Sequence, residues 1–237
     1  MLTLKNLTVK TGDKTILKNL NFHFEKGKTY AIMGPNGSGK STLSMTLMGN
    51  PAYQTDTKSS IVFNNKAVIG LSADKRAKLG IFMTYQTPIS LSGVTVFQLM
   101  RLATGGQKDP LALREEIEKH AQSLKINTEL LERSLNDGAS GGEKKKLEVL
   151  QAAIMDPRLV IFDEIDTGVD VDSLKTIARF MNKNKKDKTY IIITHYNRIL
   201  KYVRPDKVLI LIDGELKKVG MAQLATDIER EGYEKIK

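Results

Sequence analysis

Nine consecutive residues rich in glycine directly follow a short apolar run, and this stretch guides the interpretation of the rest of the sequence. The apolar run, residues 29–33, has the composition of a buried strand, and a helical pattern opens at Lys40. Glycines let the backbone fold back so that successive N–H groups face phosphate oxygens, and the amino end of a helix adds its positive dipole. The stretch is therefore predicted to be a phosphate-binding P-loop, which consists of Gly34, Pro35, Asn36, Gly37, Ser38, Gly39, Lys40, Ser41 and Thr42.

Two side chains of this P-loop carry the expected chemistry. Lys40 is predicted to reach the outer phosphates of a nucleoside triphosphate, and Ser41 is predicted to bind Mg2+. A dinucleotide-binding motif does not fit, because Thr42 stands where that motif requires a third glycine. A glycine-rich turn without a ligand is the remaining alternative, and the strand-loop-helix context argues against it.

Length and composition describe a globular protein. With 237 residues, of which 41% are hydrophobic and 27% charged, the chain is long enough for one large domain with a sizeable core. No apolar run approaches the ~20 residues of a membrane span, and the first residues lack the layout of a secretory signal, so we expect a cytoplasmic protein. The chain contains no cysteine, which excludes disulfides and thiolate ligands.

The formal net charge of +10 suggests an acidic partner, such as nucleic acid or an anionic membrane surface. The lysines are scattered, however, and their densest run lies at residues 182–188. We interpret this run as a solvated loop, with binding of a polyanion as the alternative.

The order of the predicted elements indicates an α/β protein with a helical insertion. Between residues 95 and 135 the apolar spacing becomes helical, and a further helix is expected after residue 140, ending before Pro157. The chain is thus predicted to be a single domain, with an α/β core in residues 1–86 and 157–237 and a helical subdomain in residues 87–156. Strands are predicted at 2–9, 20–24, 29–33, 60–63, 80–84, 159–162, 190–194 and 208–212, the last opening a hairpin at 213–214.

An acidic pair follows the predicted strand 159–162. Asp163 is suited to the coordination shell of Mg2+, and Glu164 is suited to polarise a water for attack on a γ-phosphate. Acidic pairs also occur in ordinary turns, so the pair alone is a weak signal. Together with the P-loop, it predicts a site for nucleotide hydrolysis.

Over nearly its whole length, the chain resembles the ATPase domain of the ABC family. Besides the P-loop and the acidic pair, it contains a glutamine loop at Gln86, a signature loop at residues 140–143, an aspartate loop ending at Asp170, and a histidine switch at His195. The resemblance implies an α/β fold with a mixed β-sheet core, an antiparallel β subdomain and a helical subdomain. It also implies an enzyme that hydrolyses ATP to ADP and phosphate.

The family pattern assigns roles to these residues. In the family, ATP lies between the P-loop of one subunit and the signature loop of another, so the resemblance implies a dimer around ATP. It implies ATP and Mg2+ as ligands, with Ser41, Gln86 and Asp163 around the metal. Lys40, Glu164 and His195 would be catalytic, and the remaining nucleotide contacts would come from Ser140, Gly141, Gly142, Glu143 and Asp170.

Three lysines, Lys144, Lys145 and Lys146, follow the signature loop at the start of a predicted helix. Cations at this end oppose the helix dipole, and an anion supplied from outside would relieve the conflict. The alternative is that these lysines simply face water.

The residues around the motifs resemble one branch of the family, the ATPases of the Suf system for iron-sulfur cluster assembly. Ile165 and Asp166 stand where most transporter members have Pro-Thr or Pro-Ser, and Thr194-His195-Tyr196 also matches the branch. This resemblance implies partners of the SufB and SufD type, in which ATP hydrolysis drives a conformational change of a soluble scaffold.

Two other functions remain as alternatives. The nucleotide-binding subunit of an ABC membrane transporter would share the catalytic residues, but Ile165-Asp166 counts against it. A nucleic-acid-handling ABC ATPase would account for the net charge, but the sequence has no recognition module or basic stripe, so no nucleic acid is expected.

Selectivity for adenine is expected to be weak. Many ABC ATPases stack adenine on an aromatic residue that precedes the P-loop, and Thr11 occupies that position in this chain. Stacking of the base would then be absent or supplied by another residue.

Overall fold

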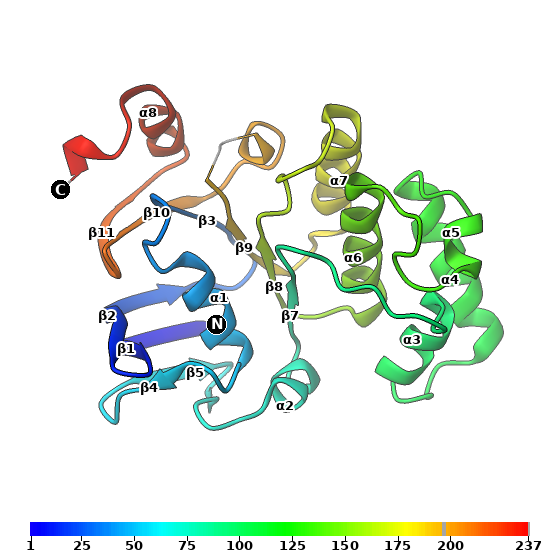
Figure 1. Cartoon of the computed structure of the whole chain (residues 1–237), viewed down its shortest axis with the longest axis horizontal. Helices are drawn as coiled ribbons and strands as arrows, with labels where there is room; N and C mark the ends of the chain where they lie inside the picture. Colours follow the sequence, from blue (N-terminus) through cyan, green and yellow to red (C-terminus); the bar gives the residue numbers. More distant parts are fainter. Residues whose placement is uncertain (196–197, 237) are drawn as a thin grey trace.

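The computed structural model describes residues 1–195 and 198–236, and its elements form two sheets and a set of helices (Figure 1). The first sheet has the strand order β2-β1-β5-β6, with β4 paired to β1, and its neighbours run antiparallel. Alternating apolar residues place one face of this sheet in the core. Its strands are β1 (Leu2–Thr11), β2 (Lys14–Phe24), β4 (Gln54–Thr55), β5 (Ser60–Phe63) and β6 (Lys66–Ala67).

The second sheet has the order β11-β10-β3-β9-β8-β7. All neighbours are parallel except β10 and β11, which form a hairpin through Asp213 and Gly214, both with positive φ. Such a two-residue turn matches the twist of the strands that it joins. The strands are β3 (Thr29–Met33), β7 (Ile81–Thr84), β8 (Leu159–Asp163), β9 (Thr189–Ile193), β10 (Lys207–Ile212) and β11 (Glu215–Gly220).

Helices cover the second sheet, and a group of them lies to one side of it (Figure 1). Helices α3 to α6 stand between β7 and β8 in the chain, and α6 contacts both α4 and α7. The helices are α1 (Lys40–Met48), α2 (Ala73–Lys78), α3 (Val96–Ala103), α4 (Pro110–Ser123), α5 (Glu129–Glu132), α6 (Gly141–Met155), α7 (Val171–Asn184) and α8 (Gln223–Glu231), with 3-10 turns η1 (Ile199–Lys201) and η2 (Glu234–Ile236).

The parallel strands separate two hydrophobic cores. Because successive side chains of a strand point to opposite faces, Val160 and Phe162 of β8 pack with the core under α6 and α7, whereas Leu159 and Ile161 pack between the two sheets. Every residue of β3, β8 and β9 is buried, which explains why these strands are continuous apolar runs rather than alternating ones.

The predicted α/β fold class is confirmed, and the predicted strands are present, but some boundaries differ. Helix α7 begins at Val171, because the Asp170 carboxylate accepts hydrogen bonds from the backbone amides of Asp172 and Ser173 and caps the helix there. The two-residue strands β4 and β6 were not predicted, since two residues are too few to show a periodicity.

Candidate functional site

The predicted site residues meet where the parallel strands end. The P-loop follows β3, Gln86 follows β7, Glu164 follows β8 and His195 follows β9. Because parallel strands place their carboxyl ends at one edge of the sheet, residues far apart in sequence reach the same cleft. The cleft has a volume of about 850 Å3 and is lined by Lys14, Thr15, Ile16, Lys18, Asn36, Gly37, Gly39, Lys40, Ser41, Thr42, Gln86, Glu164, His195 and Asp213.

The P-loop has the backbone that a phosphate cradle needs. Gly37 and Gly39 have φ values of 77° and 99°, in the left-handed region that favours glycine. At Gly34 a side chain has no room, because a Cβ would lie 2.0 Å from the carbonyl oxygen of Leu211. Together with α1, which begins at Lys40, this loop places the amino end of a helix at the cleft, where the helix dipole favours an anion.

Lys40 is held by the P-loop itself. Its Nζ donates to the carbonyl oxygens of Gly34 (2.8 Å) and Pro35 (2.9 Å) and lies 3.4 Å from Ser38 Oγ. Burial lowers its pKa to about 8, although Glu164 and Asp163 oppose the shift. The ammonium group is therefore confined near the place where the phosphates of a nucleotide would lie.

Asp163 is the last residue of β8 and is almost fully buried behind the cleft. One carboxylate oxygen, Oδ2, accepts a hydrogen bond from Ser44 Oγ at 2.7 Å, while Oδ1 is buried without a hydrogen-bond partner in the described structure. Burial raises the pKa of this carboxyl, and the nearby Glu164 adds to the increase. Ser44 was not predicted, because a serine inside a helix carries no signal of its partner across the fold.

The oxygen atoms of Asp163 and Ser41 are suitable ligands for Mg2+. The unpaired Asp163 Oδ1 and the Ser41 hydroxyl would supply hard oxygen ligands of the kind Mg2+ prefers, and a nucleotide bound in the cleft would add its phosphate oxygens. Within residues 1–195 and 198–236, no group of three or more His, Cys, Asp or Glu side chains could hold a metal by itself.

Glu164 connects the glutamine loop to the histidine switch. Gln86 Nε2 donates to Glu164 Oε2 at 2.8 Å, and His195 Nε2 lies 2.8 Å from Glu164 Oε1. Thr167 Oγ1 also donates to Oε2, at 3.3 Å. Glu164 itself has a φ of 48°, which turns the chain sharply at the end of β8 and aims the carboxylate into the cleft. Tyr196, which follows His195 in the predicted motif, lies outside the described residues.

The signature loop does not line this cleft. Ser140 caps α6 by accepting a hydrogen bond from the Glu143 amide (3.3 Å), and Glu143 Oε2 accepts from the Ser140 amide (2.8 Å). A Cβ at Gly141 would lie 2.8 Å from the Gly168 carbonyl oxygen, and one at Gly142 would lie 2.9 Å from Ser173 Oγ. The loop glycines are therefore required by packing against the aspartate loop and the start of α7.

The prediction that the lysines after the signature loop face water was wrong for Lys146, which is buried, and for Lys145. This side chain neither faces water nor awaits an external anion, because its Nζ donates to the carbonyl oxygens of Tyr85 (2.6 Å) and Gln86 (2.9 Å). Glu148, one turn further along α6, accepts from the Tyr85 amide at 2.8 Å, and burial raises its pKa to about 7. These contacts tie the signature helix to the glutamine loop.

The position at which many ABC ATPases stack adenine also differs from the prediction, which placed it at Thr11. Thr11 pairs with Lys14 at the tip of the β1–β2 hairpin and is not among the residues that line the cleft. Ile16 of β2 lines it instead, next to Thr15 and Lys18. The sequence alone missed this set, because which residues of a hairpin face a neighbouring loop depends on how the two sheets pack.

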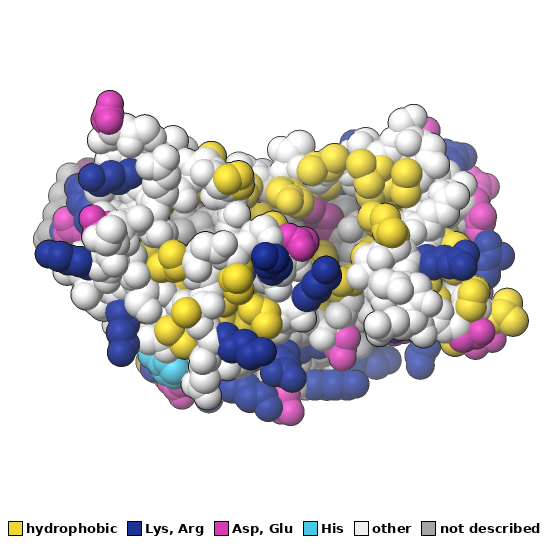
Figure 2. Space-filling view, turned by 90° about the horizontal axis from the view of Figure 1, so that it is seen from below, with side chains coloured by type: hydrophobic (Ala, Val, Ile, Leu, Met, Phe, Trp, Pro, Cys, Tyr) yellow, Lys and Arg dark blue, Asp and Glu magenta, His cyan; other side chains and the backbone are white. Residues whose placement is uncertain are grey.

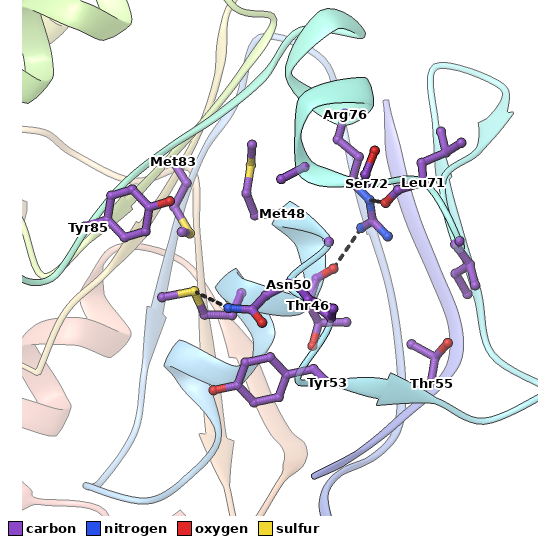
Figure 3. A pocket seen from close by; sticks show the side chains of 16 residues that line it. Thr46, Met48, Asn50, Tyr53, Thr55, Leu71, Ser72, Arg76, Met83 and Tyr85 are labelled. Carbon is purple, nitrogen blue, oxygen red and sulfur yellow. Dashed lines mark hydrogen bonds between the residues drawn. The ribbon is translucent and has the colours of Figure 1, made fainter. Parts of the chain in front are cut away.

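A second cleft, of about 580 Å3, opens beside the glutamine loop (Figure 3). In Figure 3, Met83 and Tyr85 stand on one side of it and Leu71 and Arg76 on the other, with Tyr53 across one end. Arg76 is buried and donates to the carbonyl oxygens of Thr46 (2.8 Å) and Leu47 (2.9 Å) at the end of α1. The cleft wall is thus fixed to the helix that begins in the P-loop.

Comparison with known proteins identifies relatives along the whole chain. A family model described as ABC transporter matches residues 17–167. Vegetative protein 296 of Bacillus subtilis (strain 168) is 41% identical over 243 residues, covering 100% of this chain and 93% of that protein. The probable ATP-dependent transporter ycf16 of Cyanophora paradoxa is 40% identical over 243 residues, covering 99% and 93%.

Solved structures share the fold. The ATP-binding cassette MJ0796, determined as a dimer in a post-hydrolysis state bound to ADP and Pi, matches with a TM-score of 0.81 at 21% identity, covering 94% of this chain and 99% of that chain. A bacterial Atm1-family ABC exporter with ATP bound matches with a TM-score of 0.80 at 22% identity, covering 99% of this chain and 41% of that one. In the described part of the present chain, no helix is long and apolar enough to cross a membrane.

Proposed function

Since the chain belongs to the ABC transporter family of ATPase domains, which hydrolyse ATP, we propose that it is a cytoplasmic ATPase subunit similar to SufC, acting in iron-sulfur cluster assembly. Its partners would be scaffold proteins of the SufB and SufD type. In this proposal residues 1–86 and 157–237 form the catalytic core and residues 87–156 the helical subdomain of one ATPase domain.

The hydrogen-bonded group Gln86–Glu164–His195 is the observation that carries the enzymatic part of the proposal. Lys40 and the P-loop amides would bind the phosphates, with Ser41, Gln86 and Asp163 around Mg2+, which would neutralise charge on the phosphate oxygens. Glu164 would accept a proton from the attacking water, and His195 would contact the γ-phosphate. Catalysis would then consist mainly of positioning and stabilisation of charge.

We propose that two copies dimerise around ATP. Ser140, Gly141, Gly142, Glu143 and Asp170 lie outside the P-loop cleft of their own chain, so they are available to complete the site of a second copy. The exposure of Ser140 and Gly141 at the amino end of α6 supports this assignment, because the helix dipole favours an anion there.

Asp166 supports the Suf branch over a transporter. Its buried carboxylate accepts two contacts from Thr194 Oγ1, both at 3.0 Å, and so fixes the residue that precedes His195. Most transporter members place Thr or Ser at this position, and neither provides a two-oxygen acceptor. The names of the relatives favour the second candidate, the ATP-binding subunit of an ABC transporter.

Native, anaerobic affinity purification separates these functions. The proposal expects SufB- and SufD-type proteins to copurify with the full chain. Copurification with integral membrane proteins instead would support the transporter subunit, and stimulation of ATP hydrolysis by DNA or RNA would support the nucleic-acid alternative.

The scaffold is proposed to dock over the cleft beside the glutamine loop. Tyr85 lines that cleft, and Ile89 beyond the loop is 55% exposed, whereas Leu91 packs against the core and its backbone pairs with Leu135. Ile89→Ser is expected to weaken binding of a SufB- or SufD-type partner by about tenfold or more, because a buried apolar contact would be lost. Binding is measured by titration with the purified partner.

Leu102→Ser is the matched control for Ile89→Ser, since Leu102 is 80% exposed near the carboxyl end of α3 rather than just after the glutamine loop. Both variants should fold and bind ATP, whereas Leu91→Ser should lower the melting temperature. Equal partner affinity for Ile89→Ser and the wild type would place the interface elsewhere.

Nucleotide selectivity is expected to be weak. Ile16 offers no ring for stacking of the base, so the affinities for ATP and GTP should differ by only a few-fold in competition binding. Ile16→Tyr should tighten binding of both nucleotides, because stacking on a ring contributes roughly 1–3 kcal/mol per base. Thr11→Tyr is the control and should leave nucleotide affinity unchanged, because Thr11 lies outside the cleft. A hundred-fold preference of the wild type for ATP over GTP would contradict the expected weak selectivity.

A further inference from the structure

A large polar recess lies at the edge of the parallel sheet opposite the nucleotide cleft. Its volume is about 1030 Å3, and it is bordered by α2, by the ends of α3 and α6, by α4 and by the turn between α7 and β9. The strands β7, β8 and β9 all begin beside it, whereas the P-loop cleft lies at their other ends. None of the residues assigned to nucleotide binding or hydrolysis lines this recess.

The recess gathers basic side chains from five separate segments. On the face seen in Figure 2, Lys and Arg side chains crowd the middle and one edge, with acidic side chains scattered among them. Only the folded chain brings these residues together, which is why the sequence shows no basic stripe. The cations that line the recess are Lys66, Lys78, Lys108, Arg158, Lys186 and Lys188.

Three carboxylates also line the recess, fewer than its six cations; two of them pair closely with a lysine, whereas Asp74 bonds to a neutral serine and its charge acts on Lys78. Glu116 accepts from Lys108 at 2.6 Å, Asp156 pairs with Lys188 at 2.8 Å, and Asp74 accepts from the Ser72 hydroxyl. Among the described residues, no carboxylate pairs with the other four cations, which are Lys66, Lys78, Arg158 and Lys186. The recess therefore presents unmatched positive charge in a concave surface, where attraction for an anion is strengthened.

We propose that this recess binds an acidic peptide segment of a partner protein, with its carboxylates on the unpaired lysines and Arg158. In the recess, Glu116 and Asp156 lie among the cations and would repel a carboxylate placed next to them. A peptide that carries its carboxylates at intervals, with neutral residues between them, fits this arrangement. Nucleic acid fits less well, because its phosphates form an uninterrupted row and, among the described residues, no Phe, Tyr or Trp lines the recess to stack a base. The ring of His120 does line the recess, but it packs edge-on against Phe180.

Helix α6 connects the recess to the nucleotide machinery. Lys108 Nζ, in the recess, donates to the carbonyl oxygen of Ile154 at 3.3 Å, near the end of α6, and the signature loop caps the start of the same helix. The helix has 15 residues and thus spans about 22 Å. A peptide held by Arg158 and the other unpaired cations would lie beside Lys108, and so beside the end of α6 that is opposite Ser140.

Fluorescence polarisation tests the proposal on the full chain. The probe is a labelled peptide of about ten residues in which Glu and Gly alternate, compared with a labelled oligouridylate of the same net charge. We expect the peptide to bind more tightly than the RNA, and its affinity to fall as salt increases. Lys78→Glu with Lys186→Glu should weaken peptide binding at least about tenfold while leaving ATP hydrolysis unchanged.

Lys5→Glu with Lys218→Glu is the control, because both lysines are exposed outside the recess and the double exchange also lowers the formal net charge from +10 to +6. Peptide binding that the control weakens as much as the recess variant would overturn the proposal. The absence of peptide binding would also overturn it. If the RNA binds more tightly than the peptide and the recess variant abolishes RNA binding, the recess is a nucleic-acid site and the proposal is wrong. ATP hydrolysis, measured separately, reports on the proposed function alone.

Discussion

Replacing Glu164 by glutamine is expected to lower ATP hydrolysis by roughly 10²- to 10⁴-fold, the effect of losing a general base, while ATP binding is retained. The two side chains have the same size, so the left-handed backbone at residue 164 and the contact with Gln86 are disturbed little. The glutamine amide cannot take a proton from the attacking water. Because the bound ATP is not consumed, the variant should also accumulate as an ATP-bound dimer, which size-exclusion chromatography with ATP would detect.

The control for this variant is Glu215→Gln, which removes the same charge from β11, where Glu215 pairs with Lys217 outside the cleft. Its rate should match that of the wild type. If purified Glu164→Gln hydrolyses ATP at the wild-type rate, another group acts as the base.

The second large effect is expected at His195. His195→Ala should reduce turnover by about 10²- to 10³-fold, because a group that contacts the γ-phosphate contributes most when charge shifts during transfer. The dissociation constant for ATP should change only a few-fold. In the structure the ring lies 2.8 Å from the Glu164 carboxylate, so the variant also removes one contact that orients the base.

His23→Ala provides the comparison, since His23 is exposed on β2 and its ring contacts Thr3. Single-turnover kinetics would separate binding from chemistry in both variants. A large increase in the dissociation constant with normal turnover would show that His195 serves binding rather than transfer.

Local patterns in the sequence predicted the parts of the fold that depend on few residues. The P-loop, the buried strands and the acidic pair were identified because each is a short run with a distinct composition. The rule that parallel strands end at one edge then explains why Gln86, Glu164 and His195 meet, although more than a hundred positions separate the first from the last.

Contacts between distant segments could not be predicted in this way. Three adjacent lysines after the signature loop look alike in sequence, but only the packing of α6 under the glutamine loop makes Lys145 a donor to the Tyr85 and Gln86 carbonyls. Similarly, Ile16 rather than Thr11 faces the nucleotide cleft because of how the β1–β2 hairpin meets the P-loop. Both facts depend on tertiary structure, which a single sequence does not encode locally.

The packing of the signature glycines affects how genetic experiments on a dimer would be interpreted. In a mixed dimer, one defective signature loop would be expected to inactivate a single composite site and spare the other. A Cβ at Gly142 would also press on Ser173 and Asp170 at the start of α7 in its own subunit, so Gly142→Ala would carry damage in cis as well as in trans. Complementation between a Gly142→Ala chain and a Glu164→Gln chain should therefore recover less activity than a count of intact sites predicts.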